Sequence, residues 1–163
     1  MSQRVVPMVC LIVLVVSPAA AFDLNLAIGA DFAGDFDAGN SSFSSDTGYT
    51  LGLELAFKIP LIEAGVGLEY GFSRAAEAVD VDASYYQLYA IGRFFLGPAY
   101  IAGRFGYSDL SFSEAVDGTS DAGSWGLGGG VELFGKLKIE LLFSKLGGDL
   151  SYESWTARLL YTF

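Results

Sequence analysis

The chain has 163 residues, a formal net charge of −10, no histidine and one cysteine, Cys10. The length fits one domain, and the acidic balance argues against nucleic acid as a partner, since phosphate binding needs clustered Lys and Arg. Without His the chain also lacks the usual base for nucleophilic catalysis by Ser or Cys. We therefore do not expect an enzyme.

The first 21 residues have the pattern of a secretory signal peptide. Arg4 precedes an apolar run from Val5 to Val16, and small residues up to Ala21 supply an A-x-A cleavage site. The run is shorter than the about 20 apolar residues that a membrane-spanning helix needs. We expect cleavage after Ala21, which leaves residues 22–163 as one domain without Cys, and so without a disulfide.

Residues 22–163 divide into eight segments in which apolar residues alternate with polar or small ones. Alternation with period two is typical of a strand with one apolar face. It is clearest at residues 49–59 and 62–72 and weakest in the fourth segment. The predicted strands cover residues 24–32, 49–59, 62–72, 84–96, 99–107, 124–134, 137–143 and 155–163.

The connections between these strands alternate in length. Short turns with Gly or Pro are predicted at residues 60–61, 96–98 and 135–136. Longer polar loops are predicted at residues 34–46, 74–82, 109–121 and 145–150. An even number of strands, with short turns at one end and longer loops at the other, is the layout of a bacterial outer-membrane barrel.

The composition of the two faces decides which one points inward. The polar face carries many glycines and isolated charges, which suits the lumen of an eight-stranded barrel, because that lumen is only just wide enough for side chains. We expect the glycines to make room for Arg and Glu reaching across from opposite strands. The apolar face carries no charge when the fourth strand has Tyr86, Leu88 and Phe94 outside and Arg93 inside. A charge at the bilayer midplane would cost roughly 2–4 kcal/mol. The fold class predicted is all-β, an eight-stranded antiparallel up-and-down transmembrane β-barrel.

The last strand carries the only motif that is specific to such barrels. Its alternate residues Trp155, Leu159, Tyr161 and Phe163 are apolar or aromatic. This ending resembles the C-terminal assembly signal of bacterial outer-membrane barrels, although Arg158 stands where that signal often has Gly. The whole chain resembles the small OmpX/OmpA-like eight-stranded outer-membrane β-barrel family. That resemblance implies the outer membrane of a Gram-negative-type bacterium, contact with outer-membrane lipid and lipopolysaccharide, and the barrel-assembly machinery as a partner during insertion.

Six acids and five bases are assigned to the lumen, so their charges nearly cancel. Selective pores generally present a ring of one sign, whereas a balanced set can pair into a salt-bridged plug. We hypothesise that Glu54, Glu69 and Glu140 pair with Arg104 and Arg158 at mid-height, with Arg93 in the same network; the simpler interpretation is that such pairs only satisfy buried charge. The lumen set is Asp31, Glu54, Glu63, Glu69, Glu132, Glu140, Lys58, Arg93, Arg104, Lys138 and Arg158.

The outer loops are strongly acidic. This predicts contact with a cationic surface partner, or with phosphates through divalent ions, although solubility and repulsion between neighbours explain the acids more simply. Residues 35–46 resemble a calcium loop but lack its central Gly and final Glu, so we expect no metal or cofactor. The loop acids are Asp35, Asp37, Asp46, Glu77, Asp80, Asp82, Asp109, Glu114, Asp117, Asp121 and Asp149, against Arg74 and Lys145.

Together these features favour a non-enzymatic outer-membrane β-barrel with a salt-bridged, glycine-rich lumen and acidic surface loops, in a structural or surface-interaction role. The alternative is a narrow pore, or a conduit for small or apolar molecules as in OmpW-like barrels. A soluble lipocalin-like barrel is a third interpretation.

Overall fold

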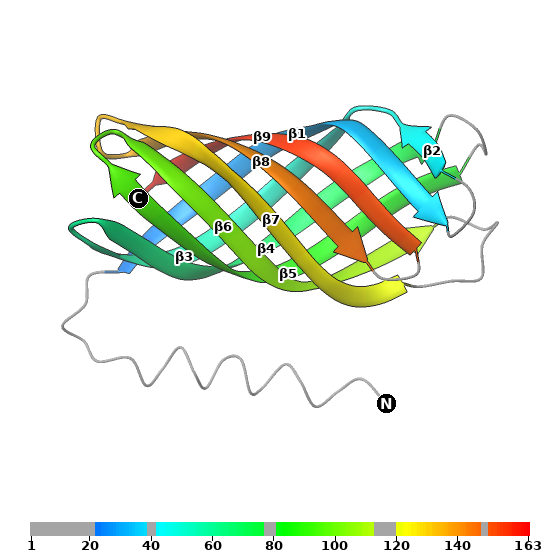
Figure 1. Ribbon diagram of the computed structural model, residues 1–163, viewed down its shortest axis with the longest axis horizontal. Helices are drawn as coiled ribbons and strands as arrows, with labels where there is room; N and C mark the ends of the chain where they lie inside the picture. The colour runs from blue at the N-terminus through cyan, green and yellow to red at the C-terminus, as the bar shows by residue number, and fades with distance from the viewer. Residues whose placement is uncertain (1–21, 39–41, 77–80, 113–119, 148–149) are drawn as a thin grey trace.

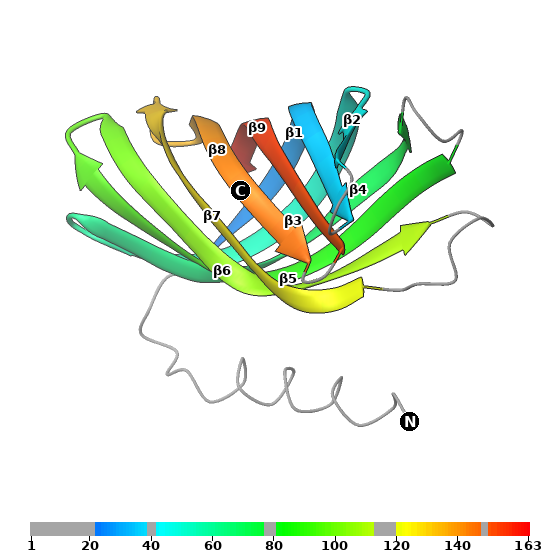
Figure 2. The ribbon, with the colours of Figure 1, turned by 45° about the vertical axis from the view of Figure 1, so that its right-hand side comes forward.

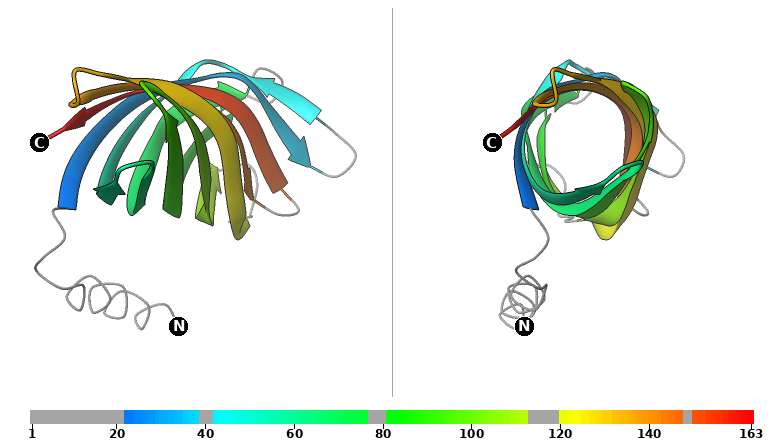
Figure 3. Two further views of the ribbon diagram at one scale, coloured as in Figure 1. Left: turned by 60° about the vertical axis from the view of Figure 1, so that its left-hand side comes forward. Right: turned by 90° about the vertical axis from the view of Figure 1, so that its left-hand side faces the viewer.

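The computed structural model describes residues 22–38, 42–76, 81–112, 120–147 and 150–163. Over these residues the chain forms one antiparallel sheet that closes on itself, and Figure 3 shows the resulting ring end-on. No helix in the described ranges is long and apolar enough to cross a membrane. The signal peptide expected at residues 1–21 lies outside the described residues. The strands are β1 (Phe22–Ala38), β2 (Ser42–Ser45), β3 (Gly48–Ile59), β4 (Ile62–Ala76), β5 (Val81–Leu96), β6 (Ala99–Phe112), β7 (Ser120–Leu133), β8 (Leu137–Gly147) and β9 (Leu150–Thr162).

Eight strands form the barrel wall, as predicted. From β3 to β9 each strand pairs with the next, β3 pairs with β1, and β1 pairs with β9 to close the ring (Figures 1 and 2). The ninth segment, β2, pairs with the outer half of β1 and meets β4 at Ser45 and Ala76. It is therefore the outer end of the second barrel strand, separated from β3 by Asp46 and Thr47.

The three turns lie where the sequence predicts them, except that Phe134, assigned to the preceding strand, belongs to the third turn because β7 ends at Leu133. The loops were predicted too long. The three short turns lie at one end of the barrel together with the C-terminus (Figure 1). At the other end β1 continues to Ala38, β6 continues to Phe112 and β9 begins at Leu150. These outer segments lack a continuous apolar face, since exposed acids such as Asp35 and Asp37 stand on the outer side of β1. Their pairing rests on backbone hydrogen bonds, which side-chain alternation does not reveal.

The outer wall of the barrel is apolar up to a ring of aromatic side chains. In the fourth predicted strand, where the alternation is weakest, the inward and outward faces were predicted correctly. Tyr86, Leu88 and Phe94 are exposed outside, whereas Arg93 is buried inside. Just above the ring, Lys145 Nζ lies 2.5 Å from Glu153 Oε1, which marks the return to water. We call this ring the outer girdle; it comprises Phe32, Tyr49, Phe72, Tyr86, Tyr107, Trp125, Phe143 and Trp155.

Candidate functional site

The lumen is the candidate site. Aromatic packing closes it at the end that carries the three short turns, which is the periplasmic end of an outer-membrane barrel. The rings of Phe95 and Tyr100 pack at a tilt of 45° with their centroids 5.0 Å apart, and Ala102 and Leu142 complete the buried cluster. The ammonium of Lys58 lies 4.2 Å from the centroid of the Phe95 ring. Lys58 Nζ also lies 2.5 Å from Glu132 Oε2, at the partly exposed mouth.

Above this cluster, Arg93 joins three carboxylates from three other strands. Its guanidinium nitrogens lie 2.7 Å from Glu63 Oε1, 2.8 Å from Glu140 Oε2 and 2.9 Å from Glu54 Oε2. Lys138 Nζ lies 2.7 Å from the second oxygen of Glu63. All five side chains are buried, so water does not screen these pairs as it does at a surface.

Arg158 makes the next level of the same arrangement. Its guanidinium nitrogens lie 2.8 Å from Glu54 Oε1, 2.9 Å from Glu140 Oε1 and 3.2 Å from Glu69 Oε2. Arg104 Nη1 lies 3.1 Å from Glu69 Oε1. We call these side chains the lumen network: four carboxylates (Glu54, Glu63, Glu69, Glu140) and four cations (Arg93, Arg104, Lys138, Arg158), all buried.

The structure brings all six residues that the sequence assigned to the charge network into contact. Arg158 meets Glu54, Glu69 and Glu140, and Arg104 meets Glu69. The sequence placed Glu63 and Lys138 in the lumen without assigning them to this network, although both belong to it.

Two tyrosines of β5 also belong to the site, and the sequence analysis missed them. The hydroxyl of Tyr89 accepts a hydrogen bond from Arg158 (2.8 Å) and donates one to Glu54 (3.0 Å). Its position is directly across from Gly67 on β4 and Gly106 on β6. A Cβ on Gly67 would lie only 2.6 Å from the Tyr89 ring.

These contacts refine the role expected for the lumen glycines. The large side chains that they admit are tyrosines and arginines, mostly from the neighbouring strand, although a Cβ on Gly52 of β3 would lie 3.7 Å from Nη2 of Arg158, which reaches there from β9. Gly71 faces Tyr85 and Gly126 faces Arg104 in the same way. Inward tyrosines spaced by four residues on β5 were the available signal, but strand register was needed to match them with glycines.

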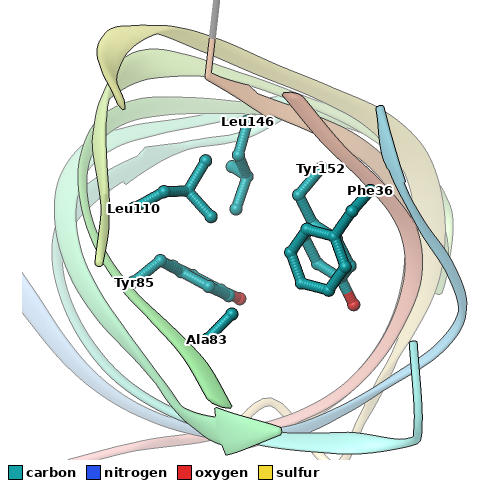
Figure 4. Packing of buried hydrophobic residues seen from close by; sticks show 6 residues of the cluster. All are labelled: Phe36, Ala83, Tyr85, Leu110, Leu146 and Tyr152. Atoms are coloured by element: carbon teal, nitrogen blue, oxygen red, sulfur yellow. The ribbon is translucent and has the colours of Figure 1, made fainter. Parts of the chain in front are cut away.

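An apolar cluster fills the lumen beyond the outer girdle. The rings of Phe36 and Tyr152 pack at a tilt of 32° with their centroids 4.7 Å apart, and Figure 4 shows the cluster pointing into the ring from several strands. The Tyr85 hydroxyl links it to the charges below, since its single proton can be donated to Asp31 (3.1 Å) or to Glu69 (3.3 Å). We call it the outer cluster: Phe36, Ala83, Tyr85, Leu110, Leu146 and Tyr152.

The C-terminal residues singled out in the sequence lie on the outer wall. Trp155, Leu159, Tyr161 and Phe163 are exposed there, whereas Arg158 points inward. The backbone N–H of Phe163 donates to the carbonyl of Leu24 at 3.0 Å, beyond the last paired residue of β9.

Only part of the acidic outer end can be placed. Asp35, Asp37 and Asp46 are exposed to solvent, and Asp109 is half-buried. β1 runs through Asp35 and Asp37, so the segment that resembled a calcium loop begins as a strand. Glu77, Asp80, Glu114, Asp117 and Asp149 lie outside the described residues, as do the side chains of Arg74, Asp82 and Asp121.

A closed antiparallel barrel with an apolar outer wall and charged side chains inside is a membrane-spanning β-barrel. Over residues 7–163 the sequence matches the family described as the outer membrane protein beta-barrel domain, and the chain belongs to this family. It is therefore a barrel of the outer membrane of a Gram-negative-type bacterium, in contact with outer-membrane lipid.

Solved structures show the same fold at low sequence identity. Ail of Yersinia pestis, solved with the heparin analogue sucrose octasulfate, is 15% identical with a TM-score of 0.59, over 87% of this chain and 99% of that one. Neisserial surface protein A is 14% identical with a TM-score of 0.59, over 87% and 97%. OprG of Pseudomonas aeruginosa is 12% identical with a TM-score of 0.55, over 89% and 96%. A search of curated proteins gives no significant match.

Proposed function

We propose that this protein is a non-enzymatic, non-conducting outer-membrane barrel with a structural or surface-interaction role. The observation that carries the proposal is a lumen filled at three levels. The Phe95–Tyr100 cluster closes the periplasmic end, the lumen network fills the middle, and the outer cluster fills the far end. An ion entering from either side would have to displace packed side chains.

The charge balance of the lumen network supports the same proposal. Four carboxylates face four cations at distances of 2.7–3.2 Å. A conducting, selective lumen presents an excess of one sign to passing ions, whereas these charges neutralise one another. Because each carboxylate of the network is already engaged by a cation, none is poised as a nucleophile or base, and we propose no catalysis.

The surface-interaction role would then belong to the outer end of the barrel. Exposed acids such as Asp35, Asp37 and Asp46 would attract a cationic partner, or lipopolysaccharide phosphates through divalent ions. The residues Trp155, Leu159, Tyr161 and Phe163 would be read by the barrel-assembly machinery after removal of a signal peptide at residues 1–21.

Conduction through planar bilayers tests the proposal. Purified protein refolded in detergent should first show heat-modifiable gel mobility, which proves that the barrel has formed. We expect the folded protein to give no steady unitary current steps under conditions in which a known porin conducts. Steady steps that scale with salt concentration would show an open lumen and contradict the proposal.

The runner-up function is a conduit for small apolar molecules, favoured by the apolar outer cluster of the lumen. Such a conduit needs an exit, and the described strands pair around the whole ring. Liposomes containing the protein should therefore be no more permeable to a small apolar solute than empty ones. Faster solute entry without ionic current would favour the conduit over the sealed barrel.

A further inference from the structure

The turn between β7 and β8 carries a large apolar side chain in an unusual position. Phe134 is 99% exposed, and its φ of 57° is in the left-handed region. For an L-residue this conformation costs roughly 1–2 kcal/mol, and it is rare for a bulky side chain. Gly or Asn normally occupies such a turn position. The ring of Phe134 is therefore held in a strained turn, and no contact with another residue in the described ranges accounts for it.

β8, the second strand of this hairpin, has the shortest run of outward apolar residues among the eight barrel strands. On β1 the outward apolar residues run from Phe22 to Phe32, whereas on β8 they run only from Leu137 to Phe143. At about 3.4 Å per residue and a tilt near 40°, these runs span heights of roughly 26 and 16 Å. The apolar band of an outer-membrane barrel is about 25 Å tall. The β8 run cannot extend outward, because the next outward side chain is Lys145, paired with Glu153.

We propose that the Phe134 ring inserts into the periplasmic leaflet and completes the lipid-facing wall at this hairpin. The partner is the glycerol and upper acyl region of the inner-leaflet phospholipids, which already covers the neighbouring wall. Lys136, exposed in the same turn, lies where its ammonium can meet lipid phosphates. Aromatic residues form girdles at both interfaces of outer-membrane barrels, and Lys or Arg is a common anchor at a membrane interface. Burial of the ring in lipid offsets the strain of its backbone.

Depth-dependent fluorescence quenching tests where residue 134 lies. In a background with Trp125→Phe and Trp155→Phe, Phe134→Trp supplies a single reporter in protein refolded into phospholipid vesicles. Lipids brominated near the headgroup end of the chain should quench it, and aqueous iodide should not. The matched control is Asp35→Trp in the same background, an exposed position beyond the outer girdle, which should show the reverse. If both reporters are quenched by iodide alone, residue 134 lies in water and the proposal is wrong.

Stability in bilayers of different thickness gives a second test, because losing the ring and relieving the backbone strain change stability in opposite directions. Phe134→Gly removes both the ring and the strain, so its effect should depend on the membrane. In bilayers whose apolar core matches the outer membrane, the folding equilibrium constant should fall relative to a thin short-chain bilayer by about tenfold or more, the range expected for burying a Phe side chain. Leu61→Gly, at the β3–β4 turn, should show a smaller dependence because the apolar runs there are longer. If Phe134→Gly stabilises the protein equally in both bilayers, the ring has no lipid contact and the proposal fails.

Discussion

At the scale of single residues, Arg158 holds the lumen together. Its guanidinium reaches Glu54 on β3, Glu69 on β4 and Glu140 on β8, and donates a hydrogen bond to the hydroxyl of Tyr89 on β5. A guanidinium has five N–H donors in a rigid plane, which allows one side chain to satisfy several acceptors at once. The residue thus connects β9 to four other strands through the interior, independently of the backbone pairing.

Removing that guanidinium leaves the four buried carboxylates of the lumen network facing only three cations, Arg93, Arg104 and Lys138. We predict that Arg158→Met lowers the free energy of unfolding by about 3–5 kcal/mol, the usual effect of removing one member of a buried ion pair. Lys145→Met is the control, since the side chain of Lys145 is 37% exposed and a pair near the surface contributes about 1 kcal/mol or less. Denaturant titration of the refolded barrels measures both. Equal losses for the two variants would contradict a special role for the buried pairs.

At the scale of elements, a bulge in β1 reverses which residues face inward. The pairing of β1 with β9 shifts between Phe32 and Asp35, and Ala33 has a φ of 49°. Below the bulge Asp31 is buried in the lumen, and above it Phe36 is buried in the outer cluster. Without the extra residue, Phe36 would face outward and the acids on either side of it would enter an apolar region.

Because the bulge changes which residues face inward, deleting Ala33 and replacing it with Gly should have opposite effects on the stability of the barrel. Deleting Ala33 should destabilise the barrel by several kcal/mol or prevent folding, because burying a carboxylate without a partner is costly. Ala33→Gly keeps the bulge and relieves the left-handed conformation, so it should preserve stability or raise it by about 1 kcal/mol. Unfolding titrations, with gel mobility as the test of folding, compare the two. Tolerance of the deletion would mean that the bulge does not set the phase.

The bulge also marks where prediction from the sequence ended. Within the membrane, lipid outside and charges inside require apolar residues to alternate with polar or small ones. Strands such as 62–72 and the inward position of Arg93 were therefore predictable from the sequence. Beyond the girdle water contacts the outer side and that contrast fades, so the sequence predicts a loop from Gly34 to Ala38 where the structure has the outer end of β1. The charged members of the site were predicted from their face alone. Tyr85 and Tyr89 were not, because their place depends on glycines brought opposite them by register.

At the scale of the whole molecule, the barrel closes between its first and last strands. β9 pairs with β1 from Thr162 opposite Asn25 to Leu150 opposite Ala38. Closure therefore depends on the strand that also carries the predicted assembly signal on its outer wall and Arg158 on its inner one. One face of β9 would serve recognition during insertion, and the other serves stability afterwards.

Two variants of β9 separate these roles. Deleting Phe163 removes an outward aromatic and one hydrogen bond to Leu24, so we predict poor assembly into the outer membrane of cells with near-normal folding of the purified chain in detergent. Arg158→Gly changes only the inner face, so it should insert normally in cells and unfold at lower denaturant concentration. Membrane fractionation measures the first property and denaturant titration the second. If the chain without Phe163 reaches the membrane as efficiently as the wild type, the outward residues of β9 are not an assembly signal, and their aromatic character reflects lipid contact alone.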